Sequence, residues 1–168
     1  MITLYLVRHG ETEDNANQIM QGQTQGKLNF KGIRQAEELR DKMLGVQIDA
    51  FVSSDLKRSF ETCEIVAKSH GQDVVATPLL RERDWGDFTG QYIPDLKDKE
   101  WPNNIESLEK IKTRAYNFII WLKANFPNQT VLAVGHGIIN KAIQSVCFSK
   151  PMNEINKMDN VEVRVLIL

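Results

Sequence analysis

Two of the chain's three histidines stand in equivalent places in the sequence. His9 follows the apolar run 2–7 and precedes a glycine, whereas His136 follows the apolar run 130–134 and is flanked by glycines, the second being Gly137. Such runs are typical of buried strands, and an open α/β sheet builds its ligand site at the carboxyl ends of its strands. Glycine lets the backbone approach a ligand, and a helix beginning at Gly137 would offer free N–H groups to an anion. We therefore expect both imidazoles and Gly137 at one anion site.

Two arginines and one glutamate belong to the same pattern. Arg8 precedes the first of these histidines, and Arg58 lies in the first turns of the helix expected after the strand-like run 50–52. Guanidinium groups stay charged and match the oxygens of a phosphoryl group. Glu82 follows the strand-like run 74–76, where it could give a proton to a leaving group. Two arginines and two histidines that converge at one sheet end indicate a phosphoryl site.

Each of these residues also has an ordinary structural interpretation. A strand ending in Arg-His-Gly could be a simple turn, Arg58 alone fits a solvated helix charge, and Glu82 alone fits the protein surface. The glycines around His136 fit a turn with a satisfied histidine. Because short motifs match often by chance, the functional interpretation depends on all of these residues meeting at one end of one sheet.

The elements that must position these residues alternate along the chain. Strand-like runs are followed by segments with helical spacing of apolar residues, which favours a three-layer α/β sandwich with a mostly parallel central sheet. The expected strands are 2–7, 50–52, 74–76, 130–134 and 161–168. The expected helices are 32–44, one that Ser53-Ser54-Asp55 caps and that runs to about residue 69, 105–122 and 138–148.

The length of 168 residues fits one domain, so we expect residues 1–168 to form a single domain. Residues 10–30 are polar and punctuated by glycine, which predicts a long loop, and such loops are often functional. Residues 84–104 contain two glycines and two prolines, and they predict a small irregular cap.

Composition argues against several function classes. The net charge of −1 provides no basic field for nucleic acid and no polybasic patch for an anionic membrane. No apolar run approaches the length that spans a bilayer, and the first residues lack the regions of a secretion signal. Cys63 and Cys147 form no disulfide framework, so a reducing compartment, the cytoplasm, is expected.

Five sequence motifs follow one another over nearly the whole chain. They are Arg8-His9-Gly10-Glu11-Thr12 with Asn15 behind it, Gln21-Gly22-Gln23-Thr24 with residues 31–36, residues 52–59, residues 80–90, and Val134-Gly135-His136-Gly137. In this order they resemble the signature of the histidine phosphatase (phosphoglycerate mutase-like) superfamily, and specifically its phosphatase branch. The chain departs from the family pattern at residues 19–20, at residues 25–28 and at Gly135, outside the catalytic residues, so the divergence concerns substrate contacts.

The resemblance implies a mechanism. His9 attacks the phosphorus of a phosphomonoester and forms a phosphohistidine, while Arg8, Arg58 and a protonated His136 hold the phosphoryl oxygens. Glu82 protonates the leaving alcohol and then activates water. The substrate contacts implied are Asn15, Gln21, Gly22, Thr24 and Gly137. No metal and no cofactor is expected, the partner is a small phosphorylated substrate, and the chain is a monomer or a homodimer.

Other functions stay open at this stage. A mutase would return the phosphoryl group to a second hydroxyl, but only residues 91–135 separate Gly90 from His136, which is short for a substrate-closing insertion, so hydrolysis is favoured. A non-catalytic phospholigand binder is a second alternative. A zinc hydrolase would use the His-x-Glu of residues 9–11 but lacks a Pro-Cys-x-x-Cys partner. A nucleotide-binding module is weaker still, because the chain has neither a P-loop nor a Gly-x-Gly-x-x-Gly motif.

Overall fold

The computed structural model describes residues 1–168 and contains one five-stranded sheet with the order β3-β2-β4-β1-β5. Four strands are parallel, and the last pairs antiparallel with β1. The strands are β1 (Thr3–Arg8), β2 (Ala50–Ser54), β3 (Val74–Thr77), β4 (Thr130–Gly135) and β5 (Val163–Ile167). The prediction of a mostly parallel sheet is confirmed.

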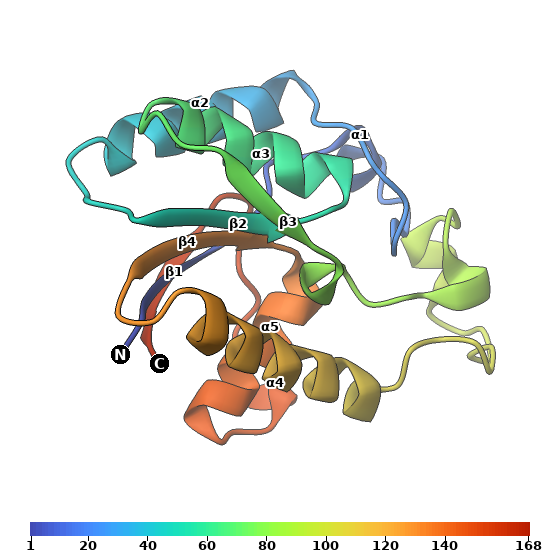
Figure 1. Ribbon diagram of the computed structural model, residues 1–168. Helices are drawn as coiled ribbons and strands as arrows, with labels where there is room; N and C mark the ends of the chain where they lie inside the picture. The colour runs from blue at the N-terminus through green and yellow to red at the C-terminus, as the bar shows by residue number, and fades with distance from the viewer.

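Helices cover both faces of the sheet and make it the middle of three layers (Figure 1). One face carries α2 (Phe30–Met43) and α3 (Lys57–Lys68), and the other carries α4 (Leu108–Asn125) and α5 (Gly137–Phe148). Each face has its own apolar core. Leu4 and Leu6 of β1 face α4 and α5, whereas Val7 faces α2 and α3, as the alternation of side chains along a strand requires. The three-layer prediction is therefore confirmed.

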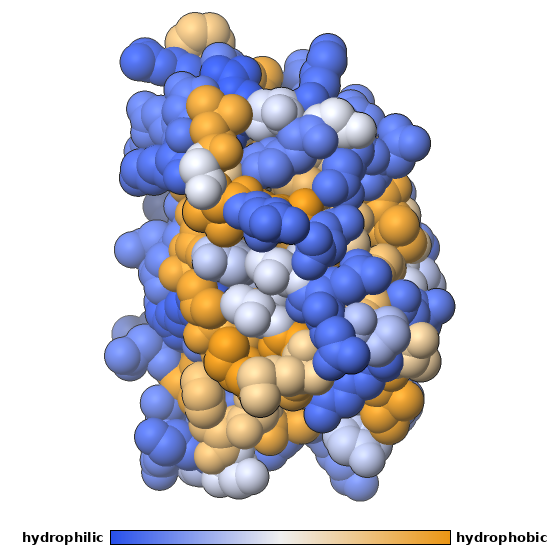
Figure 2. Space-filling model, turned by 60° about the vertical axis from the view of Figure 1, so that its left-hand side comes forward, coloured by the Kyte–Doolittle hydropathy of each residue, from blue (hydrophilic) through white to orange (hydrophobic).

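Burial on both faces explains why the central strands read as unbroken apolar runs. Residues 131–134 of β4 are completely buried, and strands covered on both sides carry no polar alternation. The edge strand β5 differs, because Leu166 is buried while Val165 and Ile167 are 52% and 61% exposed. Figure 2 brings the side with the chain ends forward and shows apolar patches interrupted by polar side chains.

Helix capping corrects two predicted boundaries. Ser107 accepts a hydrogen bond from Lys110 N–H at 3.1 Å, so α4 begins at Leu108 and not at residue 105. The expected Ser53-Ser54-Asp55 cap of α3 is wrong, because both serines belong to β2 and the residue before the helix is Leu56. The Ser54 hydroxyl instead accepts from Leu56 N–H at 3.1 Å, which shapes the turn that leads into α3.

The two irregular segments, 10–30 and 84–104, are in contact beyond the carboxyl ends of the strands. The loop 10–30 contains the short helix α1 (Glu13–Ala16), whose start is capped by Thr12. Residues 84–104 form two single turns, η2 (Gly86–Phe88) and η3 (Ile93–Leu96). A bridge between Ile19 and Tyr92 joins the segments. None of the helices is long and apolar enough to cross a membrane.

Candidate active site

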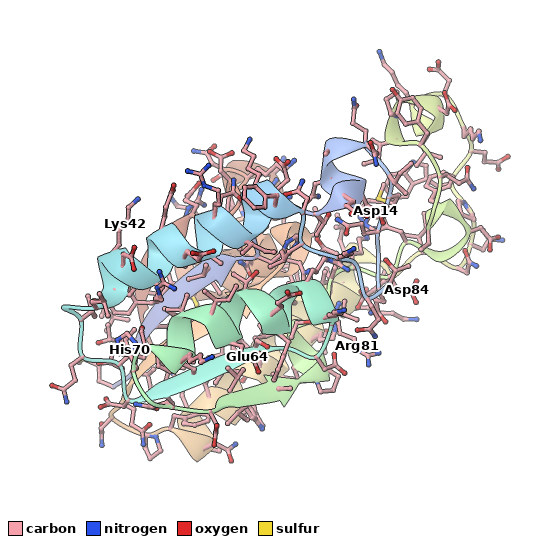
Figure 3. All side chains as sticks on the ribbon, turned by 90° about the horizontal axis from the view of Figure 1, so that it is seen from above. Asp14, Lys42, Glu64, His70, Arg81 and Asp84 are labelled. Carbon is pink, nitrogen blue, oxygen red and sulfur yellow. The ribbon has the colours of Figure 1, made fainter.

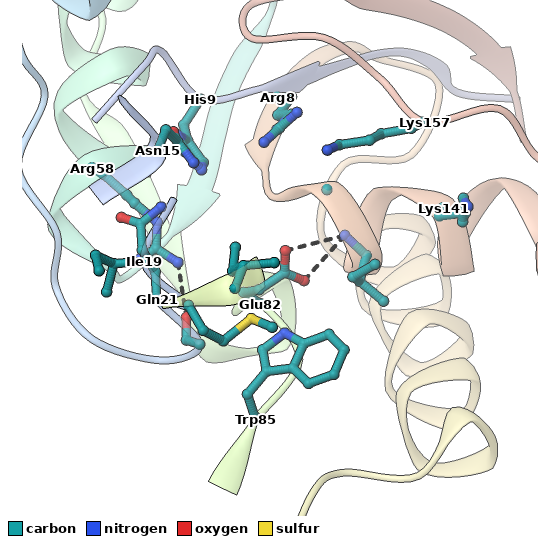
Figure 4. A pocket seen from close by; sticks show the side chains of 15 residues that line it. Arg8, His9, Asn15, Ile19, Gln21, Arg58, Glu82, Trp85, Lys141 and Lys157 are labelled. Atoms are coloured by element: carbon teal, nitrogen blue, oxygen red, sulfur yellow. Dashed lines mark hydrogen bonds between the residues drawn. The ribbon is translucent and has the colours of Figure 1, made fainter. Parts of the chain in front are cut away.

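A cavity of about 250 Å³ opens where β1 and β4 end, and it brings most of the predicted residues together (Figure 4). The predicted residues that line it are Arg8, His9, Asn15, Gln21, Gly22, Arg58, Glu82 and Gly137. His136 lies against His9, with ring centroids 5.0 Å apart. The third histidine, His70, lies at the far end of α3 from Asp14 and Arg81 (Figure 3). The sheet therefore brings His9 and His136 together at the cavity, whereas His70 lies away from it.

His9 is held in one tautomer by its own backbone. Its side chain is 2% exposed, and Nδ1 lies 2.6 Å from the carbonyl oxygen of Gly10. Since a carbonyl only accepts, Nδ1 carries the proton and Nε2 keeps its lone pair. Backbone bonds fix the residue, because His9 N–H donates to Gly135 O at 3.1 Å and Asn160 Nδ2 donates to His9 O at 2.9 Å. The imidazole thus presents a neutral nucleophilic nitrogen.

Two glycines allow the turn after His9 to pack against the neighbouring helices. A Cβ on Gly10 would lie 2.6 Å from the carbonyl oxygen of Gly32 in α2, closer than atoms can approach. Gly10 N–H donates to Thr62 Oγ1 of α3 at 3.1 Å. The turn is therefore fixed from both sides.

Arg58 is a buried cation that organises the loop above it. The residue is 1% exposed; Nη2 donates to Gly22 O at 2.8 Å, and Nη1 donates to the carbonyl of Thr24. Burial lowers its pKa to about 10, so it remains charged at neutral pH. Gly26 has a φ of 71°, and a Cβ there would lie 2.8 Å from Arg58 Cδ. The absence of a side chain at Gly26 therefore makes room for Arg58.

Two predicted site residues, Thr24 and His136, do not line the cavity, and of the two only His136 lies against His9. Thr24 is held inside its loop. Its hydroxyl donates to Gln21 O at 2.8 Å, and its carbonyl accepts from Arg58. Gln21 does line the cavity, and its Oε1 accepts from Thr12 Oγ1 at 3.0 Å. The polarity of Thr24 is used inside the loop, which corrects the prediction of a substrate contact.

Glu82 reaches the cavity by capping α5. Its Oε1 accepts from Ile138 N–H at 3.1 Å, from Ile139 N–H at 3.2 Å and from Arg83 N–H at 2.8 Å. An anion at the start of a helix is stabilised by free N–H groups and by the helix dipole. Glu82 itself takes the N–H groups of Ile138 and Ile139, so these two of the N–H groups expected to face the ligand are already engaged.

Gly137 lies between the acid and the first arginine. A Cβ built there would lie 3.7 Å from Glu82 Oε2 and 3.8 Å from Arg8 Nε. Arg8 is anchored by its Nη1, which donates to Met158 O at 2.7 Å, while its buried Nε has no partner within the chain. Because glycine has no side chain, Gly137 leaves space next to the unpaired Nε donor of Arg8.

His136 is completely buried, and neither of its ring nitrogens has a hydrogen-bond partner within the chain. Burial lowers the pKa of His136 well below 6.5, and Arg58 acts in the same direction. The protonated state expected from the sequence is therefore not favoured by the protein's own groups. An entering phosphoryl dianion would supply the opposite charge and favour the proton.

The two buried imidazoles predict a stability loss in mild acid. Burial and Arg58 also lower the pKa of His9 well below 6.5. Below about pH 6.5 the imidazoles of the unfolded chain bind protons that those of the folded chain do not, so the free energy of unfolding falls as the pH falls. Urea unfolding should lose about 2–3 kcal/mol between about pH 7.5 and about pH 5.5.

A matched pair of variants isolates this effect. The double variant His9→Gln with His136→Gln should flatten the pH dependence in that window, whereas His70→Gln should keep it, because the His70 ring lies outside the cavity near the carbonyls of Val66 and Val46. An unchanged slope in the double variant would show that the imidazoles are not its cause.

The opposite wall of the cavity is apolar and comes from the two irregular segments. Trp85 lines it, held by Arg83 at 4.7 Å from its ring centroid and by Trp101 at 5.5 Å between centroids. The neighbouring Phe88 does not line the cavity and packs on Trp101 instead. Ile19 and Met20, where the chain departs from the family pattern, also line the cavity. The lining residues that the sequence did not indicate are Ile93, Ile138, Lys141 and Lys157. Helical spacing from Gly137 could have found Lys141, but no signal marked Lys157.

The geometry does not assemble a zinc site. The Glu11 carboxylate accepts from Asn29 Nδ2 at 2.9 Å and lies 3.5 Å from Lys31 Nζ, so it turns away from His9. No three His, Cys, Asp or Glu side chains come together as a metal site would require. The groups present instead combine a nucleophile, two arginines and a carboxylate around one small space.

Comparisons with known proteins agree with this geometry. An uncharacterized phosphatase, PhoE, of Bacillus subtilis is 36% identical over 141 residues, which cover 82% of this chain and 72% of the relative. A probable phosphoglycerate mutase, GpmB, of Cronobacter sakazakii is 31% identical over 165 residues, covering 90% of this chain and 77% of the relative. The solved structure of Bacillus stearothermophilus YhfR superimposes with a TM-score of 0.91 at 26% identity, covering 98% of this chain and 90% of that one.

A family model agrees over almost the whole length. The model described as histidine phosphatase superfamily (branch 1) matches residues 4–168, a range that contains every residue of the cavity. The chain therefore belongs to branch 1 of the histidine phosphatase superfamily.

Proposed function

We propose that this protein hydrolyses small phosphomonoesters through a covalent phosphohistidine on His9. The observation that carries the proposal is the fixed tautomer, because the bond from Nδ1 to Gly10 O leaves Nε2 free as a neutral nucleophile at the cavity. Arg8 and Arg58 bring fixed positive charge to the same space. A buried cationic cradle beside a neutral nucleophile suits attack on a phosphoryl dianion.

The first step transfers the phosphoryl group to the protein. His9 Nε2 attacks the phosphorus, a P–N bond forms, and the ester P–O bond breaks in line. Arg8, Arg58 and His136, with Asn15 beside them, hold the remaining phosphoryl oxygens. Glu82 gives a proton to the leaving oxygen as the ester bond breaks.

The second step returns the protein to its starting state. Glu82, now a carboxylate, removes a proton from water, whose oxygen attacks the phosphorus as the P–N bond breaks. Inorganic phosphate leaves and His9 is again neutral. Because the two arginines and His136 supply the positive charge, we propose that no metal and no cofactor takes part.

Hydrolysis is preferred to mutase chemistry because nothing long closes over His9. None of residues 94–136 lines the cavity, and the long helix α4 in this stretch packs beneath the sheet through Ile111, Ala115 and Phe118. Water can then reach the phosphohistidine. A non-catalytic binder fits less well, since no member of the catalytic set is missing.

The product of a defined substrate tests this proposal. Purified protein should release inorganic phosphate from para-nitrophenyl phosphate, with and without a chelator. With 3-phosphoglycerate it should yield glycerate and phosphate. Formation of 2-phosphoglycerate without phosphate would assign a mutase, and inactivity over a broad panel of phosphomonoesters would assign a binder.

Setting and assembly follow as further proposals. Cys63 is buried and Cys147 is partly buried, and both are free, which supports a reducing compartment, the cytoplasm. The exposed edge of β5 offers a surface through which two copies of the chain can pair, so we propose that the protein is a monomer or a homodimer. The small cavity supports a small phosphorylated substrate, without nucleic acid or membrane as partners.

A further inference from the structure

Two lysines line the cavity, and the phosphoryl chemistry uses neither of them. Lys141 lies on α5 one turn after Gly137, and Lys157 lies in the loop before β5. Figure 4 shows Lys157 extending toward Arg8, with Lys141 farther along the helix. The ion pairs of the chain all involve other residues. Two cationic side chains therefore face the substrate space without a carboxylate partner.

The charges around the cavity are unequal. Arg8, Arg58, Lys141 and Lys157 line it, against the single carboxylate of Glu82, which is already engaged with the N–H groups of α5. A phosphomonoester carries up to about two negative charges at neutral pH, and the arginines beside the nucleophile match them. The lysines are left as positive charge that a simple phosphate ester does not balance.

The acidic residues behind Arg8 do not remove this excess. Burial lowers the pKa of Arg8, while Glu82, Asp159 and Glu162 act in the opposite direction, so the latter two lie near its guanidinium. Neither lines the cavity, however. Glu162 is also paired with Arg164 at 2.7 Å. Their charges support Arg8 from behind and leave the lysine side of the cavity positive.

The cavity is also divided by polarity. Ile19, Met20, Trp85 and Ile93 line the side formed by the loop 10–30 and the cap segment. The lysines come from α5 and the segment before β5. A ligand that fills the space therefore meets the phosphoryl cradle at one end, an apolar wall on one side and ammonium groups on the other.

We propose that Lys141 and Lys157 form a second anion subsite, which binds an acidic group carried by the same molecule as the ester. The inference rests on the proposed function, because it places the scissile ester at His9. Carboxylate and phosphate share the chemistry that an ammonium group recognises. A cavity of about 250 Å³ limits the substrate to a short chain between its two acidic ends.

Matched substrates test the subsite. 3-Phosphoglycerate and glycerol 1-phosphate differ in one carboxylate, and propanediol bisphosphate and propanediol monophosphate differ in one phosphate. Wild-type kcat/KM should favour the acid-bearing member of at least one pair by about tenfold, the sum expected of two partly exposed charge contacts. The preferred pair identifies which acidic group the subsite takes.

Variants assign the preference to the two lysines. Lys141→Gln with Lys157→Gln should bring the ratio within each pair close to one, mainly by raising KM for the acid-bearing substrate, and should lower kcat/KM for para-nitrophenyl phosphate by a smaller factor than for that substrate. Lys123→Gln with Lys150→Gln removes the same charge from exposed positions outside the cavity and should keep the wild-type ratio.

The outcomes separate the two proposals. If the protein hydrolyses all the esters but neither pair shows a preference, or if the lysine variant keeps the preference, the subsite is overturned while the proposed function stands. If no ester is hydrolysed, the proposed function fails first, and the subsite fails with it.

Discussion

His9→Ala should abolish turnover, with kcat lowered by about 10⁴-fold or more. The substitution removes the only nitrogen that the structure presents to the cavity as a neutral nucleophile, because His136 is completely buried and does not line the cavity. The arginines remain, so phosphate binding should persist. Steady-state hydrolysis of para-nitrophenyl phosphate measures the loss, and a phosphate titration measures the binding.

Controls separate chemistry from folding. His9 is buried, so truncation to alanine should lower stability by about 1–3 kcal/mol, which a urea melt will report while the variant stays folded. His70→Ala removes the third histidine, which lies outside the cavity, and should leave turnover close to wild type. A folded His9→Ala variant with wild-type activity would end the proposed mechanism.

Glu82→Gln should slow hydrolysis of alkyl phosphates by about 10²–10⁴-fold. An alkoxide needs a proton to leave, whereas para-nitrophenolate leaves without one, so the loss should be much smaller with para-nitrophenyl phosphate when cleavage limits the rate. The amide keeps one acceptor oxygen for the N–H groups of Ile138 and Ile139. Rates for both esters, measured by single-turnover kinetics, give the comparison.

The cap role of Glu82 adds a second effect to the same variant. Losing the negative charge at the start of α5 should lower stability by about 0.5–1 kcal/mol, and a thermal melt will show it. Glu109→Gln is the matched control, because Glu109 is exposed in the first turn of α4. If Glu82→Gln lowers the hydrolysis rates of the alkyl phosphate and of para-nitrophenyl phosphate by the same factor, Glu82 is a structural cap and not the acid.

The sequence predicts the residues that we propose for catalysis because their signals are local. A buried parallel strand reads as an apolar run, its carboxyl end marks the ligand edge, and Arg8, His9 and His136 stand directly after such runs. Arg58 follows β2 in the same way. The order of strands in the sheet, β3-β2-β4-β1-β5, had to come from the structure, because pairing joins segments far apart in the chain.

Contacts across long sequence separations explain what sequence reasoning missed. Glu82 caps the helix that begins at Gly137 and accepts hydrogen bonds from Ile138 and Ile139, two of the N–H groups that the sequence left free for a ligand. Thr24 does not line the cavity, because its carbonyl accepts a hydrogen bond from Arg58 inside the loop. Lys157 enters the cavity from the segment before β5, and no local motif marks it.

Gly135 shows how the structure explains a departure from the family pattern. A Cβ at this position would collide with the side-chain oxygen of Asn140. Asn140 Nδ2 donates to Val7 O at 3.0 Å, which ties α5 to β1 next to Arg8. The asparagine therefore occupies the volume that any side chain at residue 135 would need, so the glycine is a packing requirement.

A rapid-quench experiment tests the central claim most directly. The protein is mixed with an excess of a phosphomonoester labelled with ³²P, quenched in alkali within one turnover, digested and mapped. The account predicts one labelled peptide that contains His9, stable to alkali and lost in acid, and no label in the His9→Ala variant. Label on another residue, or its complete absence during active turnover, would contradict the account.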